Sequence, residues 1–348
     1  MKDLLVASDI PGYSGFTKMM TNVGQTSNKG IELNVQGWIV NNPTWSLNAT
    51  LNIGHNVNKI DKLASGETEW ILSSGWAGNS LLNTDDYRAY VGGTIGRIYG
   101  YVNDGFYTVD DFDHFDATAR TWTLKKGVVD CSILSGTPRP GNAKFKKLVD
   151  DGTDVLTSDD RTIIGNTTPK ASGGFGMNAT WKNFDASFFC NFMVGFDVYN
   201  ANKISMVTWW NNSYNNLAGV MKGAWMNFDD MGNEIRYQPE ILAKYNENAT
   251  MWNPTSIGAP IAMSYGIEDG SFLRLQTVTL GYSLPLSIIR KVHMTKCRFY
   301  FTGYNLLTLT GYSGYDPEVD IATGLTPNID YNRYPRSRSY TIGVQLQF

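Results

Sequence analysis

Apolar and polar residues alternate strictly along the last ten residues of the chain, from Ser339 to Phe348. Every second side chain from Tyr340 onward is apolar, and the residues between them are serine, threonine, glycine and glutamine. A period of two predicts a β-strand with one apolar face and one polar face. The same pattern occupies residues 45–54, so that segment is also predicted to be a strand.

Short turns rich in asparagine join several alternating segments into predicted hairpins. The three hairpins pair residues 31–39 with 45–54, 174–181 with 184–192, and 277–284 with 297–301. Two further strands are predicted at 88–96 and 97–108, where glycines interrupt the pattern.

The connections between the hairpins are long and polar, far longer than the usual length of roughly four to six residues. They occupy residues 58–87, 109–172, 198–270 and 311–336. Short turns on one side and long loops on the other are typical of outer-membrane barrels, whose strands need about 9 to 11 residues to cross a bilayer. One alternating segment alone fits a soluble β-protein equally well, but several together favour an all-β fold, an antiparallel transmembrane β-barrel segment with long extracellular loops.

Composition supports this interpretation and excludes other classes. Only 18% of the 348 residues are charged, against about 25% in an ordinary soluble domain. The net charge of −3 provides no basic surface for nucleic acid. No apolar run approaches the roughly 20 residues of a membrane-spanning helix.

Catalytic motifs are not visible in the sequence. The three histidines, His55, His114 and His293, are far apart, and no nucleophile elbow or phosphate-binding loop occurs. The three cysteines are widely spaced and are predicted to be packing residues. We therefore expect a protein that is not an enzyme and has no cofactor. Calcium is the one ion for which the sequence offers a candidate site.

An acidic stretch that includes Asp150, Asp151 and Asp160 has the carboxylate density of a calcium loop. The spacing fits poorly, because counting back from Asp160 places Val149 at the first ligand position and Asp154 where glycine is expected. A calcium site and a solvated acidic loop both remain possible interpretations.

Four aromatic residues lie among many asparagines in the longest connection: Trp209, Trp210, Tyr214 and Trp225. Aromatic rings beside amide side chains suit sugar rings, which offer an apolar face and a rim of hydroxyls. We consider them candidate contacts to a substrate or to a partner protein, with packing inside the loop as the alternative.

Several stretches resemble the carboxyl-terminal part of the SusC/RagA family of TonB-linked outer-membrane transporters of Bacteroidota. The resemblance rests on residues 269–285, 303–319 and 335–348, together with 28–33 and 159–166. It implies a barrel of about 22 strands with a plug. It also implies import of oligosaccharides or peptides with a SusD-like lipoprotein lid, energised through TonB and the proton gradient.

The end of the chain also resembles an outer-membrane assembly signal. The matching positions are Thr341, Gly343, Leu346 and the terminal aromatic Phe348. The resemblance implies recognition by the BAM insertion machinery.

Residues 1–348 are thus expected to be the carboxyl-terminal part of a transporter barrel, without its plug, TonB box or signal peptide. Two alternatives stay open. A stand-alone small porin or adhesin barrel requires strand 337–348 to pair near residue 31, because an unpaired edge is costly in lipid. A soluble glycan-binding β-protein requires the apolar faces to be buried in one core.

Overall fold

The computed structural model describes residues 2–9, 18–63, 67–78, 81–82, 85–208, 218–321 and 324–348. For residues 2–9 and 18–23 it describes the backbone alone. The fold is all-β, as the alternating pattern predicts, with a few short helices between the strands. In the described residues, no helix has the length and apolar character needed to cross a membrane.

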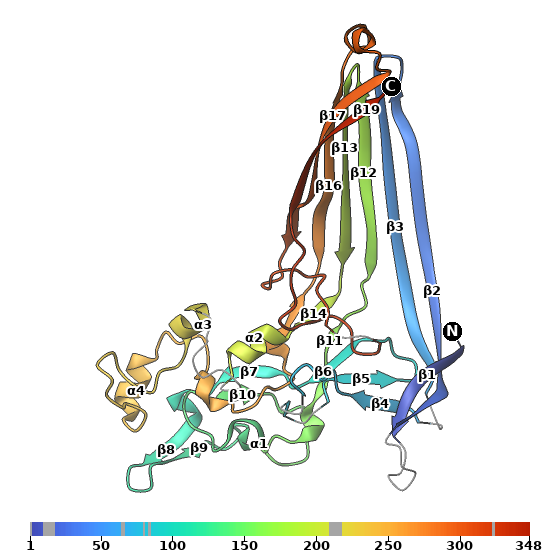
Figure 1. Cartoon of the computed structure of the whole chain (residues 1–348). Coiled ribbons are helices and arrows are strands. Elements are labelled where there is room, and N and C mark those ends of the chain that lie inside the picture. Colours follow the sequence, from blue (N-terminus) through green and yellow to red (C-terminus); the bar gives the residue numbers. More distant parts are fainter. Residues whose placement is uncertain are drawn as a thin grey trace.

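Eight long strands form one antiparallel sheet, which stands as a tall wall in Figure 1. In spatial order, the strands are β1 (Lys2–Asp9), β2 (Lys18–Asn41), β3 (Trp45–Lys62), β12 (Ala171–Trp181), β13 (Phe184–Val194), β16 (Phe272–Ser283), β17 (Lys296–Thr310) and β19 (Ser339–Gln347). The three predicted hairpins are β2–β3, β12–β13 and β16–β17, and all three are confirmed.

The turns within these hairpins lie together at one end of the sheet (Figure 1). In the β2–β3 turn, Asn42 accepts hydrogen bonds from the backbone N–H groups of Thr44 and Trp45, at 3.0 and 2.8 Å. In the β12–β13 turn, Lys182 adopts a left-handed conformation with φ of 52°, and its N–H donates to the carbonyl of Thr44. Side-chain and backbone contacts thus stabilise the predicted tight turns.

The apolar face of the sheet is exposed. On β19, Ile342 is 85% exposed, and the other apolar side chains of that strand are also exposed. Near the turns, a row of aromatic rings crosses four strands: Trp45 lies 5.6 Å from Trp181, which lies 6.0 Å from Phe184, which lies 4.7 Å from Tyr282. A large exposed apolar surface bordered by aromatic rings is typical of a lipid-facing barrel wall.

The connections at the other end of the sheet contain short strands and helices (Figure 1). The strands are β4 (Glu69–Leu72), β5 (Tyr87–Tyr90), β6 (Arg97–Gly100), β7 (Asn103–Phe106), β8 (Phe112–Asp116), β9 (Thr121–Leu124), β10 (Ala143–Phe145), β11 (Thr162–Asn166), β14 (Asp197–Asn200), β15 (Ile267–Asp269) and β18 (Ile329–Asp330). The helices are α1 (Ser132–Ser135), α2 (Ala201–Met206), α3 (Ala218–Gly223) and α4 (Pro239–Tyr245). A further short helix, α5 (Leu286–Ile289), lies in the β16–β17 hairpin, at the end of the sheet where the other hairpin turns lie (Figure 1).

The two strands predicted at 88–96 and 97–108 are found only as shorter strands, and they do not belong to the eight-stranded sheet. This region contains β5, β6 and β7, which pair with β4, β11 and β10 in small separate sheets. Residues 63–170 therefore form one long connection between β3 and β12. The physical reason lies in the glycines that interrupt the pattern: Gly92 and Gly96 have positive φ and end the strand conformation between β5 and β6.

A hydrophobic core lies within these connections rather than on the sheet. Its fully buried members come from all three long connections and include Tyr87, Tyr107, Phe145, Trp252 and Ile329. The connections are therefore one packed body rather than separate flexible loops.

The sheet is open in the part of the chain that the structure describes. β19 pairs with β17, β1 pairs with β2, and neither makes a second pairing. The pairing near residue 31 that would close a small barrel is thus not formed, and the apolar faces are not buried in one core as a soluble β-protein requires.

Trp252→Ala tests the packed core of the connections. Trp252 is fully buried, its indole N–H donates to the carbonyl of Val207 at 3.0 Å, and its ring lies 4.8 Å from that of Tyr265. We expect a loss of about 3–5 kcal/mol in the free energy of unfolding of this body. Limited proteolysis in outer-membrane vesicles measures the effect; Met231→Ala, at an exposed side chain, is the control. Equal protease resistance of both variants contradicts a shared core.

Candidate functional site

A cavity of about 780 Å³ lies where the polar face of the sheet meets the connections. Glu32 on β2 and Asn58 on β3 line it from the sheet, and Thr168 and Asn328 line it from two connections. Asn58 holds these walls together: its amide oxygen accepts from the N–H of Ile95 at 2.7 Å, and its amide nitrogen donates to the hydroxyl of Thr168 at 3.3 Å. The cavity is therefore built by hydrogen bonds that join distant segments.

A second cavity, of about 510 Å³, lies between α2 and the last connection. Tyr315, which is 87% exposed, lines its rim. Tyr265 forms another wall, and the ammonium of Lys203 lies 4.4 Å from the centre of its ring. The remaining lining is mainly polar and includes Asn200, Asn202, Asp330 and Asn332.

Hydrogen bonds hold two acidic groups in place: Glu268, which contacts residues of the lining, and Asp330, which lines the cavity. Glu268 pairs with Lys203 at 3.1 Å and accepts from both the N–H and the hydroxyl of Ser313. Burial alone would raise the pKa of Glu268, but these donors and the ammonium lower it. Asp330 accepts from the hydroxyl of Tyr312 at 2.7 Å, yet burial keeps its pKa above the usual value. The cavity thus combines ordered polar groups with one exposed and one half-buried aromatic ring.

An ion pair attaches the last connection to the sheet. The guanidinium of Arg274, on β16, is buried and donates to both carboxylate oxygens of Asp316, at 2.6 and 3.2 Å. Glu318 lies 3.0 Å from Arg274 and 3.2 Å from Arg336, so it bridges the two guanidinium groups. This network positions the segment that carries Tyr315 beside the polar face of the sheet.

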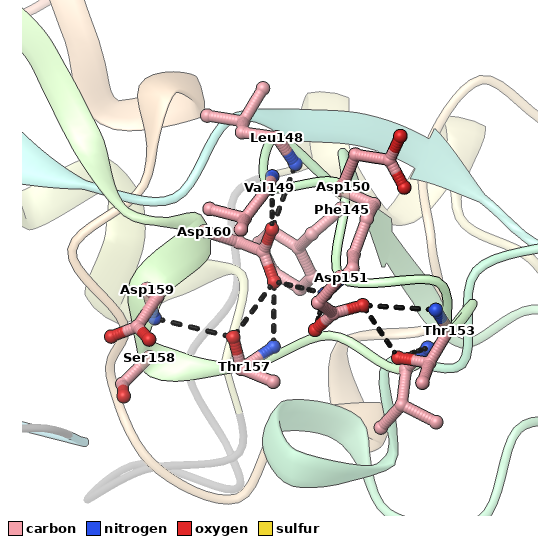
Figure 2. A network of polar contacts seen from close by, with 12 residues as sticks. Phe145, Leu148, Val149, Asp150, Asp151, Thr153, Thr157, Ser158, Asp159 and Asp160 are labelled. Atoms are coloured by element: carbon pink, nitrogen blue, oxygen red, sulfur yellow. Dashed lines mark hydrogen bonds and ion pairs between the residues drawn. The ribbon is translucent and has the colours of Figure 1, made fainter.

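The acidic stretch predicted as a calcium candidate is organised around Asp160 (Figure 2). The carboxylate of Asp160 is buried and accepts from the backbone N–H groups of Leu148, Val149 and Thr157, at 2.8, 2.9 and 2.7 Å. The hydroxyl of Thr157 also donates to it, at 3.2 Å, and the ammonium of Lys147 lies 3.3 Å away. Burial raises the pKa of Asp160, but the three N–H groups and the ammonium lower it below the usual value.

Asp151 and Asp150 lie beside this group and form local turns. Asp151 accepts from the N–H and hydroxyl of Thr153 and pairs with Lys147 at 2.8 Å, which lowers its pKa to about 2. Asp150 accepts from the N–H of Gly152 at 3.4 Å. The carboxylates of Asp151 and Asp160 therefore both accept hydrogen bonds from groups of the protein itself. Calcium binding here is not tested by this arrangement and stays a prediction.

The predicted aromatic contacts are only partly described. Trp209, Trp210 and Tyr214 lie outside the described residues. Trp225 is 2% exposed and packs with Ile235, Leu242 and other apolar side chains, so its position is that of a core residue and lends no support to a contact role.

Three residues of the predicted assembly signal, Thr341, Gly343 and Leu346, lie on β19, the last strand of the sheet, and Phe348 follows it directly. Leu346 and Phe348 are exposed on its apolar face. Gly343 lies opposite Tyr300 on β17, whose ring covers the position where a Cβ would stand. Thr341 lies opposite Thr302 on the same strand. These positions are consistent with the predicted signal, whose recognition is untested.

Sequence reasoning missed the residues that build the second cavity. Arg274 and Asp316 fall inside the stretches that carry the family resemblance, but nothing in their local pattern indicates that they pair across 42 positions. Tyr315 could have been found from the sequence, because it is an aromatic residue in a polar turn, between Gly314 and Asp316.

An antiparallel sheet with one exposed apolar face, one polar face, short turns at one end and large packed connections at the other has the features that are typical of the walls of outer-membrane barrels. Comparisons with known proteins agree with this class. TonB-dependent receptor P3 of Formosa agariphila is 30% identical over 353 residues, which cover 100% of this chain and 31% of the receptor. TonB-dependent receptor SusC of Bacteroides thetaiotaomicron is 26% identical over 357 residues, which cover 99% of this chain and 29% of that protein.

Solved structures of a transporter show the same fold. A structure of the RagAB peptide transporter aligns with 100% of this chain and 32% of its own, with a TM-score of 0.70 and 24% identity. A structure of the RagAB peptide importer in the closed-closed state has a TM-score of 0.69 and 25% identity and is covered to 32%. No family model matches the chain. The chain matches the carboxyl-terminal portion of SusC/RagA-like receptors, which confirms the resemblance, and spans about a third of the length of its curated relatives.

Asp160→Asn tests the organisation of the acidic stretch. Because the folded-state pKa of Asp160 is depressed, its stabilisation is present above the unfolded value of 3.8 and is lost as the pH falls through the folded pKa. The variant is expected to exchange amide hydrogen faster at residues 147–160 and to lose this acid dependence. Asp159→Asn, at an exposed carboxylate of the same turn, is the control. Unchanged exchange in Asp160→Asn contradicts the organising role.

Arg274→Met tests the attachment of the last connection. Removing the cation leaves the Asp316 and Glu318 carboxylates without their shared partner, which is expected to cost about 3–5 kcal/mol. Hydrogen exchange across residues 311–338 should rise. Arg338→Met, at an exposed arginine of the same segment, is the control and should leave hydrogen exchange unchanged. An equal effect of both variants would contradict a specific attachment through Arg274.

Proposed function

We propose that this chain forms the carboxyl-terminal part of an outer-membrane importer of the SusC/RagA type. One observation supports this most strongly: the whole chain matches TonB-dependent receptors while its sheet exposes an apolar face. In this proposal the eight-stranded sheet is part of a closed barrel of about 22 strands in the bacterial outer membrane, and further strands pair with β1 and β19. The relatives are named as receptors and transporters, which points to a role that is not enzymatic.

The proposed cargo is an oligosaccharide. Support comes from the cavity between α2 and the last connection, where Tyr315 and Tyr265 stand beside several asparagine side chains. Aromatic rings stack on sugar rings, and amides hydrogen-bond to hydroxyl groups. A peptide is the second candidate, because the similar solved structures are those of a peptide transporter.

The proposed partners follow from the relatives. A SusD-like lipoprotein would cover the connections, as SusC and RagAB suggest. TonB would act through the part of such receptors that this chain does not match. The BAM machinery would recognise Thr341, Gly343 and Leu346 on β19 together with Phe348, which follows this strand.

Uptake by whole cells tests the proposal. Deleting the coding region of this chain should abolish uptake of fluorescent oligosaccharides, and collapsing the proton gradient should abolish it in the parent strain. Tyr315→Ala should lower uptake about threefold to tenfold through loss of ring stacking. Tyr334→Ala is a matched control, because Tyr334 is 88% exposed on the same connection but does not line the cavity.

Each result separates the candidates. Loss of oligopeptide uptake with normal oligosaccharide uptake would replace the glycan proposal by the peptide candidate. Normal uptake of both in the deletion strain contradicts import by this chain.

A further inference from the structure

Three arginines converge on a cavity of about 340 Å³ in the outermost part of the connections. Arg120 follows β8 in its hairpin with β9, Arg139 lies in the segment before β10, and Arg236 lies before α4. These segments lie near one another and away from the long strands in Figure 1. The described lining also includes Trp122, Tyr237 and three polar side chains, and it contains no aspartate or glutamate. The volume is in the range of pockets that bind small ligands.

Two of the guanidinium groups contact the same aromatic ring. The guanidinium carbon of Arg120 lies 5.1 Å from the centre of the Tyr237 ring, and that of Arg236 lies 5.8 Å from the same centre. Tyr237 itself stacks on Phe115, with 6.1 Å between ring centres. The Tyr237 ring therefore contacts two guanidinium groups, and Arg139 lines the same cavity.

Protein carboxylates balance these charges only in part. Arg236 lies 2.6 Å from Glu234. In the described part of the chain, Arg120 and Arg139 have no carboxylate within ion-pair distance. The surrounding chain is acidic overall, with a net charge of −3, so this concentration of positive charge is local.

Arg120 occupies an unusual backbone position. Its φ is 55°, in the left-handed region that favours glycine or asparagine. The preceding turn is stabilised by Asp116, which accepts from the N–H groups of Thr118 and Ala119. The turn itself therefore does not require an arginine. Glycine is therefore the replacement that removes the Arg120 side chain while suiting the backbone.

We propose that this cavity binds an oxyanion, namely the carboxylate, sulfate or phosphate group of a small ligand. Guanidinium groups present planar pairs of N–H donors that match such groups in bidentate geometry. Arg120 and Arg139 supply the uncompensated charge, and Tyr237 orients Arg120 and Arg236. The site is separate from the cavity beside Tyr315, and its occupancy does not depend on transport.

Isothermal titration of the protein purified from outer membranes in detergent tests this site. The probes are glucuronate, glucose 6-sulfate, glucose 6-phosphate and N-acetylglutamate, with glucose as the neutral reference. At least one anionic probe should bind ten times more tightly than glucose or better, and its affinity should fall as salt rises. Binding confined to the sugar probes indicates an anionic saccharide, and binding of N-acetylglutamate indicates an acidic peptide.

Arg120→Gly separates ligand binding from folding. Glycine accepts the left-handed backbone, so thermal stability should be equal or higher, while anion affinity should fall about tenfold to a hundredfold. Arg120→Lys keeps the charge but not the planar pair of donors, so its anion affinity should lie between those of the parent protein and Arg120→Gly. Lys126→Ala is a matched control, because it removes an exposed charge from the same hairpin region outside the cavity.

Two results would overturn the proposal. One is the absence of anion binding above the glucose level in the parent protein. The other is an equal affinity in Arg120→Gly and Lys126→Ala, which would make the attraction a general effect of charge rather than a site.

Discussion

Antiparallel pairing between β3 and β12 is the constraint on which the rest of the molecule depends. Side chains alternate across a strand, so the register that places Trp45 opposite Trp181 decides which face of the whole sheet is apolar. A slip of one residue would turn the apolar side chains of one strand to the polar face. The pairing joins two strands that are separated by residues 63–170. It holds both ends of that connection at the same end of the sheet.

This constraint explains why the connections pack into one body. The three long connections all leave the sheet at the end opposite the tight turns, so their apolar residues meet there (Figure 1). Hydrogen bonds and ion pairs then stabilise the polar segments: Asp160 orders residues 147–160, and Arg274 attaches the last connection to β16. The cavities form where these segments meet one another and the sheet.

Two surfaces of this body carry different chemistry. The cavity beside Tyr315 has a mainly polar lining, in which Lys203 pairs with Glu268, and an exposed tyrosine ring at its rim. The cavity beside Tyr237 has excess positive charge and lies in the outer connections. The two proposed sites therefore suit different ligands, one beside the sheet and one in the outer connections.

The sequence by itself determined the all-β fold, the three hairpins, the two-faced strands and the family resemblance, because these depend on local alternation and turn residues. It did not determine that residues 88–108 lie in small sheets, since a short strand has the same local pattern in a wall or in a loop. The candidate site was predicted least well. The residues that flank Trp225 in the sequence do not indicate whether its ring is exposed or buried. Only its packing against Ile235 and Leu242 shows that it is a core residue. The pairing of Arg274 with Asp316 and the convergence of Arg120, Arg139 and Arg236 were decided by tertiary structure alone, because contacts between distant residues leave no periodic signal in one sequence.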